Sequence, residues 1–413
     1  MREKVSTSST LVCDTSEAGW LMMNGLNGSN ASYLDYNATA PIRPEALAAV
    51  VEAMQSVGNA SSMHHPGRQA AERVDVARRQ LADLLGCSPG EIIFTSGATE
   101  ANNLALRAAF TAGNTLVTSP VEHPAVLETA RAITAESPED LVLLPVDTDG
   151  LVGLDALDLV FASRPGGVVS LMLANNETGV LTDLRVAAKA AREAGALVHT
   201  DATQIIGRLP VDVTELDVDL LSLSAHKFGG PQGVGALYVR RGSPLPHRPL
   251  LVGGGQERGW RAGTLNVAGI IGMGAAADAA RRGLGEEVER IAVLRDRLEN
   301  LVTGALPGCR INGRRDQRLP GVTSITIPGV PADAVLAAMP DVAASEGSAC
   351  ASGAPTPSHV LLAMGLSRED ADSTIRFSLG YATTNAEIEH AAHAVKRAVA
   401  QVRDALAEAH GPR

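Results

Sequence analysis

The sequence lacks an apolar run of 18 or more residues, so no segment is expected to cross a membrane as a helix. It also lacks a CxxC pair. Its four cysteines are scattered, which signals neither a metal site nor a disulfide framework; they are Cys13, Cys87, Cys309 and Cys350. The simplest interpretation is a cytoplasmic protein with reduced thiols.

Positive charge is scarce as well, because the formal net charge is −11. Such an acidic excess disfavours a phosphate-binding surface, so we expect no direct binding of nucleic acid, although a local basic patch remains open. The Gly-rich segment 253–264, GGGQERGWRAGT, matches neither a dinucleotide fingerprint nor a P-loop. It is more typical of a backbone that approaches a ligand or another subunit, and Thr264 at its end could donate to a phosphate.

The chain has 413 residues, of which 45% are hydrophobic, and this suits two packed domains. Residues 1–30 are rich in Ser, Thr, Asn and Gly and lack the apolar core of a signal peptide. We expect them to be a mobile extension, or sequence upstream of a start at Met22 or Met23. The predicted large domain covers 37–283, and the small domain combines 31–36 with 284–413.

Short apolar strands are predicted to alternate with helices in the first two thirds of the chain. The strands are expected at 91–95, 114–120, 166–174, 196–202, 220–225 and 235–241. This alternation is typical of a mostly parallel sheet covered on both faces. A long helix over 270–301, with a break near Gly283–Gly285, leads to a smaller α/β domain with strands at 321–329 and 374–380 and a helix at 386–409.

Polar clusters follow four of these strands, and ligands of open α/β sheets bind at such strand ends. In SAHKFGG, Lys227 directly follows an apolar strand and precedes a Gly-rich turn. A pocket lysine is partly desolvated, which lowers its pKa and lets its amine form a Schiff base. The alternative is an ordinary turn lysine on the surface. Ser224 and His226 flank it and could hold a phosphate oxygen.

The segment TSGATE (95–100) predicts an anion site at a helix N-terminus. Gly97 allows a sharp turn, after which the amides of Ala98 and Thr99 open the helix. An ordinary capped helix is the alternative.

Two further strand ends carry groups suited to a pyridine ring. Asp201 in HTDATQ could pair with a protonated ring nitrogen, or simply cap the following helix. Gln204 and Asn176 could reach a phenolic oxygen. His123 in VEHPAV could stack on the ring and move protons, or face solvent.

The small domain contributes a thiol and a guanidinium. Cys350 lies in a segment rich in Gly, Ser, Ala and Pro (344–359), where we expect a flexible loop and an accessible nucleophile. Arg376 in TIRFSLG could hold a carboxylate through two hydrogen bonds, or form a structural ion pair.

Together these motifs closely resemble the cysteine desulfurases of the NifS/IscS kind, class V aminotransferases of pyridoxal-phosphate fold type I. The resemblance runs from about Tyr33 to about Asp404, with FTSGATEANNLAL, NNETG, HTDATQ, SAHKFGGPQGVGALYVRRG, ERGWRAGT, GSAC and IRFSLG in order. It implies an α/β fold with a mostly parallel, seven-stranded sheet in the large domain and a smaller α/β domain.

The resemblance also implies roles for single residues. Lys227, Cys350 and His123 match catalytic residues, with Lys227 as the Schiff-base lysine and Cys350 as the persulfide-forming thiol. Asn176 and Arg376 match the residues that bind the substrate. The matches to the pyridoxal 5'-phosphate site are Ala98, Thr99, His123, Asn176, Asp201, Gln204, Ser224, His226, Lys227 and, completing the neighbouring site of a homodimer, Thr264.

The implied activity is the removal of sulfur from L-cysteine, giving L-alanine and a persulfide that passes to a sulfur-acceptor protein. The acceptor stays open between iron–sulfur assembly, thiolation of tRNA or cofactors, and DNA phosphorothioation. The alternatives are a selenocysteine lyase, a class V transaminase and an inactive scaffold of sulfur transfer. Glu346 departs from a position that is usually serine, and its charge would tend to raise the pKa of the nearby thiol.

Overall fold

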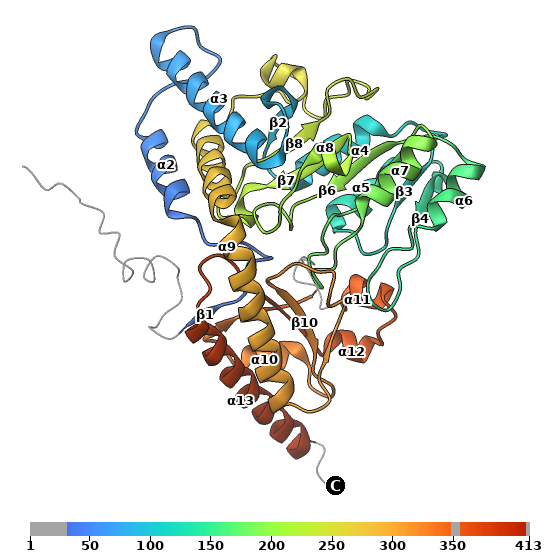
Figure 1. Ribbon diagram of the computed structural model, residues 1–413, viewed down its shortest axis with the longest axis vertical. Helices are drawn as coiled ribbons and strands as arrows, with labels where there is room; N and C mark the ends of the chain where they lie inside the picture. Colours follow the sequence, from blue (N-terminus) through green and yellow to red (C-terminus); the bar gives the residue numbers. More distant parts are fainter. Residues whose placement is uncertain (1–30, 348–355, 410–413) are drawn as a thin grey trace, which may run out of the picture.

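The computed structural model describes residues 31–347 and 356–409 (Figure 1). A larger body with a long sheet lies above a smaller body in the view of Figure 1, and helix α9 (Val267–Ala305) runs through both. The predicted extension 1–30 and the predicted nucleophile Cys350 lie outside the described residues.

The larger body is built on a seven-stranded sheet in the order β2-β8-β7-β6-β5-β3-β4. Strand β8 is antiparallel to both β2 and β7, and the other neighbours are parallel, so the predicted mostly parallel sheet is confirmed. The strands are β2 (Ile92–Thr95), β3 (Leu116–Thr118), β4 (Leu141–Leu143), β5 (Val168–Ser170), β6 (Leu197–Asp201), β7 (Leu220–Ser224) and β8 (Gly235–Val239).

Strand β5 is shorter than the apolar run 166–174 suggested. The strand itself comprises Val168–Ser170, and beyond it the amides of Leu171 and Leu173 still donate to the backbone oxygens of His199 (3.2 Å) and Asp201 (3.1 Å) of β6. Strand β4 was not predicted at all, and its first two residues are only half-buried.

Helices cover both faces of this sheet because successive strand residues point to opposite sides. Ile93 packs with α4 (Ala98–Ala109) and α5 (Pro124–Ile133) on one face. Ile92 and Phe94 pack with α3 (His65–Leu85), α7 (Leu184–Glu193) and the start of α9 on the other. The remaining helices of this part are α2 (Pro44–Met54), α6 (Ala156–Ser163) and α8 (Val213–Leu216).

The smaller body has an antiparallel sheet in the order β12-β13-β10-β9. Its core joins Leu34 and Phe377 to residues from α9 and from the last described helix. Its elements are β9 (Arg310–Ile311), β10 (Val322–Thr326), α10 (Ala332–Ala337), β12 (Ser345–Glu346), α11 (His359–Ala363), α12 (Arg368–Asp372), β13 (Thr374–Ser378) and α13 (Asn385–Ala409), with β1 (Ser32–Tyr33) and β11 (Val342–Ala343) paired beside them.

The predicted break in the long helix is wrong, because α9 continues through Gly283 and Gly285. Each glycine in a helix interior is worth about 1 kcal/mol less than alanine. Packing at both ends outweighs that loss, since Ala277 belongs to the core of the larger body and Ile291 to that of the smaller one. The domain ranges 37–283 and 284–413 stay a prediction.

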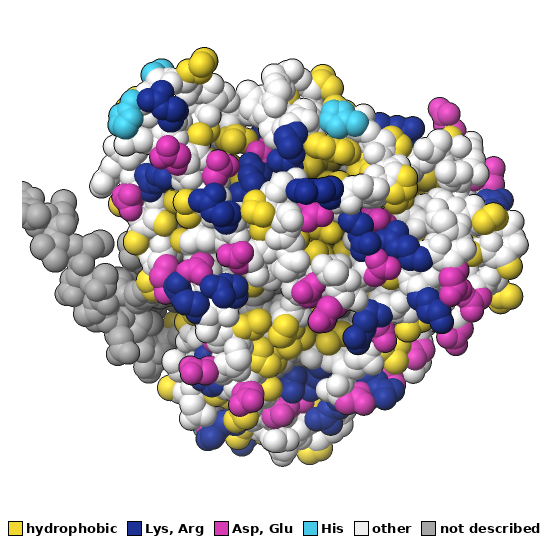
Figure 2. Space-filling model, turned by 45° about the horizontal axis from the view of Figure 1, so that its top comes forward, with side chains coloured by type: hydrophobic (Ala, Val, Ile, Leu, Met, Phe, Trp, Pro, Cys, Tyr) yellow, Lys and Arg dark blue, Asp and Glu magenta, His cyan; other side chains and the backbone are white. Residues whose placement is uncertain are grey.

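Acidic and basic side chains intermingle on the face shown in Figure 2. This face therefore presents no large field of one sign. Among the described residues, no helix combines the length and apolar character that crossing a bilayer requires.

Candidate active site

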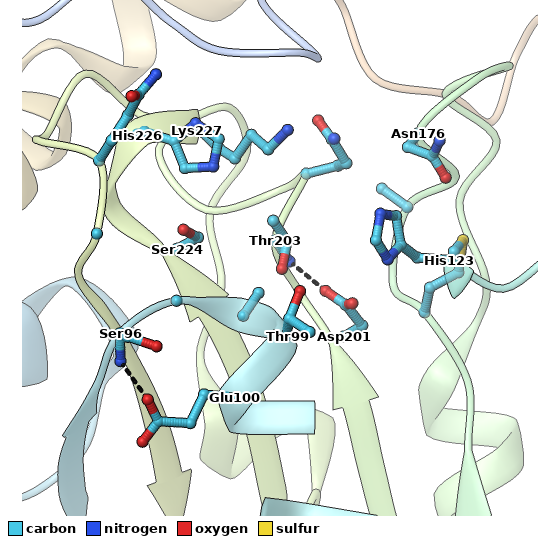
Figure 3. A pocket seen from close by; sticks show the side chains of 17 residues that line it. Ser96, Thr99, Glu100, His123, Asn176, Asp201, Thr203, Ser224, His226 and Lys227 are labelled. Carbon is cyan, nitrogen blue, oxygen red and sulfur yellow. Dashed lines mark hydrogen bonds between the residues drawn. The ribbon is translucent and has the colours of Figure 1, made fainter. Parts of the chain in front are cut away.

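A cavity of about 380 Å³ opens where the carboxyl ends of the parallel strands meet the N-terminus of α4 (Figure 3). The structure brings nine predicted residues to its wall: Ala98, Thr99, His123, Asn176, Asp201, Gln204, Ser224, His226 and Lys227. Gly97, predicted as the turn residue before α4, also lines the cavity. Sequence reasoning assigned no site role to the remaining lining residues, which are Ser96, Glu100, Met172, Ala174, Thr203, Gln232 and Gly233.

The first turn of α4 forms one end of the cavity. A Cβ at Gly235 of β8 would lie 2.6 Å from the Cα of Gly97, so glycine is needed there for the turn to pack against the sheet. The opening amides of Ala98 and Thr99, together with the helix dipole, favour an anion at this place.

Glu100 lies at the rim of this anion site. Its carboxylate accepts from the amide of Ser96 (2.9 Å) and from Nε of Arg261 (2.9 Å). Burial alone would raise the pKa of Glu100, but these hydrogen bonds outweigh it and lower the pKa. Arg261 thus balances a negative charge beside a site suited to an anion.

The Asp201 carboxylate is fixed from two sides. Asn102 of α4 donates to Oδ2 (2.7 Å), and the amide of Thr203 donates to Oδ1 (2.9 Å). These bonds hold the carboxyl group in one orientation at the cavity floor. Sequence reasoning missed Asn102, although an amide among the buried positions of an amphipathic helix was the available signal.

Lys227 ends the short turn η3 (Ala225–Lys227), directly after β7. Its Nζ donates to the backbone oxygens of Asn37 and Ala38, the latter at 2.7 Å. Asn37 also accepts from Nε2 of Gln204 (3.1 Å). The chain before α2 therefore holds the amine at the cavity, a contribution that was not predicted.

The two cavity histidines are biased toward their neutral forms. Nδ1 of His123 accepts from the amide of Ala125 (3.0 Å), so the proton of the neutral ring is on Nε2. Burial lowers the pKa of His123, although the nearby Asp201 opposes this. Burial lowers the pKa of His226 to about 4, and its Nδ1 contacts the hydroxyl of Thr39 (3.1 Å).

Three polar atoms at the cavity wall are buried and lack a hydrogen-bond partner among the described residues. They are Oδ1 of Asn176, Oγ1 of Thr203 and Oε1 of Gln204. Each such group costs about 1–3 kcal/mol if it stays unpaired. A polar ligand in the cavity would satisfy them. The cavity therefore suits pyridoxal phosphate. It offers an amine for the aldehyde, a fixed carboxylate for the pyridine nitrogen, an anion site for the phosphate and amide groups for the remaining polar atoms.

Three predicted residues do not line this cavity. Arg376 lies on β13, 3% exposed, and donates to Asp35 Oδ1 (2.7 Å) and to the backbone oxygen of Asn176 (3.0 Å). Thr264 is exposed, outside the cavity of its own chain. Cys350 lies outside the described residues.

Glu346 is the residue that departs from the usual serine before Cys350. Burial and, to a lesser degree, the charges of Asp333 and Asp372 raise the pKa of Glu346 and so shift it toward its neutral form.

Known proteins share this architecture and much of the sequence. The chain is 44% identical over 380 residues to "Cysteine desulfurase IscS" of Histophilus somni, covering 90% of this chain and 93% of that protein. Among solved structures, a NifS-like protein is 33% identical with a TM-score of 0.83, covering 90% of this chain and 100% of the other. The structure "SspA in complex with cysteine" is 32% identical with a TM-score of 0.75, covering 86% and 100%.

The family termed "Aminotransferase class-V" matches residues 32–390, which takes in both bodies and every strand of the seven-stranded sheet. This confirms the family assignment that the motifs predicted. The chain belongs to the class-V aminotransferase family.

Proposed function

We propose that this protein is a cysteine desulfurase, which removes sulfur from L-cysteine with the help of pyridoxal 5'-phosphate. The observation that carries the proposal is one cavity that joins the Lys227 amine, the fixed Asp201 carboxylate and the α4 N-terminus. The 44% identical relative that bears the name of cysteine desulfurase supports the same activity.

Bound pyridoxal phosphate would supply an electron sink for the substrate carbon. Its phosphate suits the amides of Ala98 and Thr99, with Ser224 and His226 nearby. Asp201 would keep a proton on the pyridine nitrogen, and Lys227 would bind the aldehyde. Thr264 of a second copy completes the phosphate site in this proposal, and its exposure leaves it available for that contact.

Residues of this chain also orient the substrate and move its protons. Asn176 and Arg376 bind the carboxylate of L-cysteine, and for this Arg376 exchanges its ion pair with Asp35. Nζ of Lys227 removes the proton from Cα. His123 suits proton transfer at the substrate because its proton is on Nε2 and burial disfavours its charged form.

The sulfur step uses the thiolate of Cys350. It attacks the substrate sulfur, so an S–S bond forms while the Cβ–S bond breaks. The electron pair of the broken bond stays with the substrate carbon, which takes up a proton and leaves as L-alanine. The products are one alanine and one persulfide on Cys350, which an acceptor protein then receives.

The direct experiment supplies the purified protein with pyridoxal phosphate and L-cysteine, without any keto acid. We expect alanine and transferable sulfur in equal amounts. Alanine that appears only when a keto acid is added would instead identify a transaminase. Turnover confined to selenocysteine would identify a selenocysteine lyase, and failure to bind the cofactor would leave a scaffold.

A further inference from the structure

Glu177 is a fully buried acid that the steps above do not use. It follows Asn176 in the turn between β5 and α7 and is 2% exposed. Its own turn does not need the carboxyl group, because the Asn175 side chain accepts from the amides of Glu177 (2.9 Å) and Thr178 (3.0 Å). The carboxyl instead points to the smaller body.

There it meets both described flanks of the segment that carries Cys350. The hydroxyl of Ser358 donates to Oε2 of Glu177. A Cβ at Gly347 would collide with the same oxygen, so the carboxyl group lies directly against this glycine and a side chain there would displace it. Burial raises the pKa of Glu177, although Ser358, His359 and Arg376 oppose the shift.

Neighbouring contacts reinforce the attachment on the Ser358 side. Nε2 of His359 contacts the backbone oxygen of Glu122 (2.9 Å), the residue before His123. Val360 and Leu361 of α11 share an apolar cluster with Val121. The chain from Ser358 onward is thus fixed to the two turns that present Asn176 and His123 to the cavity.

Because Gly347 and Ser358 are held in place, the length of chain between each of them and Cys350 limits how far the thiol can lie from the cavity. Cys350 is three residues from Gly347, a stretch that spans at most about 11 Å, and eight residues from Ser358, which allows about 28 Å. The Gly347 end is therefore the tighter tether. Moving Gly347 would change the greatest distance that the chain allows between Asn176 and Cys350.

We propose that Glu177 is a positioning residue for sulfur transfer, whose carboxyl fixes Gly347 and Ser358 against the cavity turn. It acts by accepting the Ser358 hydrogen bond and filling the space beside Gly347, and it touches neither the substrate nor the cofactor. This inference rests on the proposed function, because its test measures the thiol step of that reaction.

The test compares two partial reactions of the pyridoxal-phosphate-loaded protein. Exchange of the α-hydrogen of L-alanine with D₂O, followed by NMR, reports the Lys227 proton step without any thiol. Single-turnover formation of persulfide on Cys350 from L-cysteine, measured by alkylation and mass spectrometry, reports sulfur transfer. The variants are Glu177→Ala, Glu177→Gln and Ser358→Ala.

We expect Glu177→Ala and Ser358→Ala to slow persulfide formation about tenfold, with α-hydrogen exchange within about twofold of the unaltered protein. Glu177→Gln keeps an acceptor of the same size, so it should stay within roughly threefold in both assays. If Glu177→Ala fails to fold, Ser358→Ala carries the test alone.

Ser367→Ala is the matched control. Ser358 caps the five-residue helix α11 through Leu361, and Ser367 caps the five-residue helix α12 through Asp370. Equal rates of persulfide formation in Ser358→Ala and Ser367→Ala would overturn the inference. So would an equal fall in persulfide formation and α-hydrogen exchange in Glu177→Ala. A Glu177→Gln variant that forms persulfide as slowly as Glu177→Ala would overturn it too. Absence of persulfide in the unaltered protein would instead overturn the proposed function.

Discussion

The two sides of the site differ in how ready they are to receive a ligand. On the larger body, the buried amide oxygens of Asn176 and Gln204 have no hydrogen-bond partner within the described ranges, and the α4 amides face the cavity. On the smaller body, Arg376 already donates through both terminal nitrogens, to Asp35 and to the backbone of Asn176. Under the proposed function the cofactor side is therefore preformed. On the substrate side both terminal nitrogens of Arg376 are already engaged, and only its Nε lacks a partner among the described residues.

Lys227→Ala should have the largest effect, because it removes the amine that, in the proposed function, both binds the cofactor and moves the substrate proton. Alanine formation should fall by about 10⁴-fold or more, and the yellow colour of the lysine-bound cofactor should disappear. Lys189→Ala, an exposed lysine on α7, is the control. If the Lys227→Ala variant stays yellow and active, Lys227 is not the residue that binds the cofactor, and the proposed cofactor site is wrong.

Cys350→Ser separates the two sides of the site. The variant should keep the bound cofactor and its colour but lose alanine and persulfide formation by about 10³-fold, since the proposed nucleophile is removed. Cys309→Ser is the control, because burial raises the pKa of that thiol and disfavours its reactive form. Normal turnover by Cys350→Ser would refute the assignment of the nucleophile.

Arg376→Lys tests the partner exchange on the smaller body. A lysine cannot present two parallel donors, so the KM for L-cysteine should rise about 10- to 100-fold while the cofactor stays bound. Asp35→Asn removes the competing carboxylate and should lower the KM. Arg310→Lys, on the exposed edge of the same sheet, should match the unaltered protein. If Asp35→Asn raises the KM, the ion pair helps substrate binding rather than competing with it.

The smallest effect concerns the interior of the larger sheet. His199 is fully buried between the hydroxyls of Ser170 (2.8 Å) and Ser222 (3.0 Å), and burial lowers its pKa to about 4. Between that value and the higher pKa of an unfolded histidine, only the unfolded state binds the proton. The free energy of unfolding should therefore fall as the pH drops through this window, by at most about 1.4 kcal/mol per pH unit.

Urea denaturation at several pH values between neutrality and pH of about 4.5 would measure this dependence. His199→Gln should show a shallower dependence than the unaltered protein, because glutamine does not titrate. An equally steep loss of stability in the variant would assign the acid sensitivity to other groups.

Several features were predictable because they follow from local chemistry. The alternation of apolar strands and helices indicated the mostly parallel sheet, and polar residues directly after strands indicated where a cavity would lie. Lys227 and Asp201 were identified this way, and they line the cavity together with His123. The continuous α9 was not predicted, because its glycines are tolerated only through packing against two separate cores.

Residues that act through distant partners were missed for a related reason. Asn102 orients Asp201 across 99 positions of sequence, and Asn37 holds Lys227 across 190. Glu177 reaches Ser358 across 181. A single sequence carries no signal for such pairs beyond polar residues in apolar surroundings, because each contact exists only once segments far apart in the chain are packed together.

The sequence by itself determined the chemical groups and their places at strand ends, since turns and helix starts depend on neighbouring residues. Only the tertiary structure decided which groups already have partners. Arg376 is engaged by Asp35, Asp201 is fixed by Asn102, and no described residue pairs with the side-chain oxygen of Asn176. Hydrogen-bond satisfaction depends on distances between segments far apart in the chain, and these are set by how the cores pack.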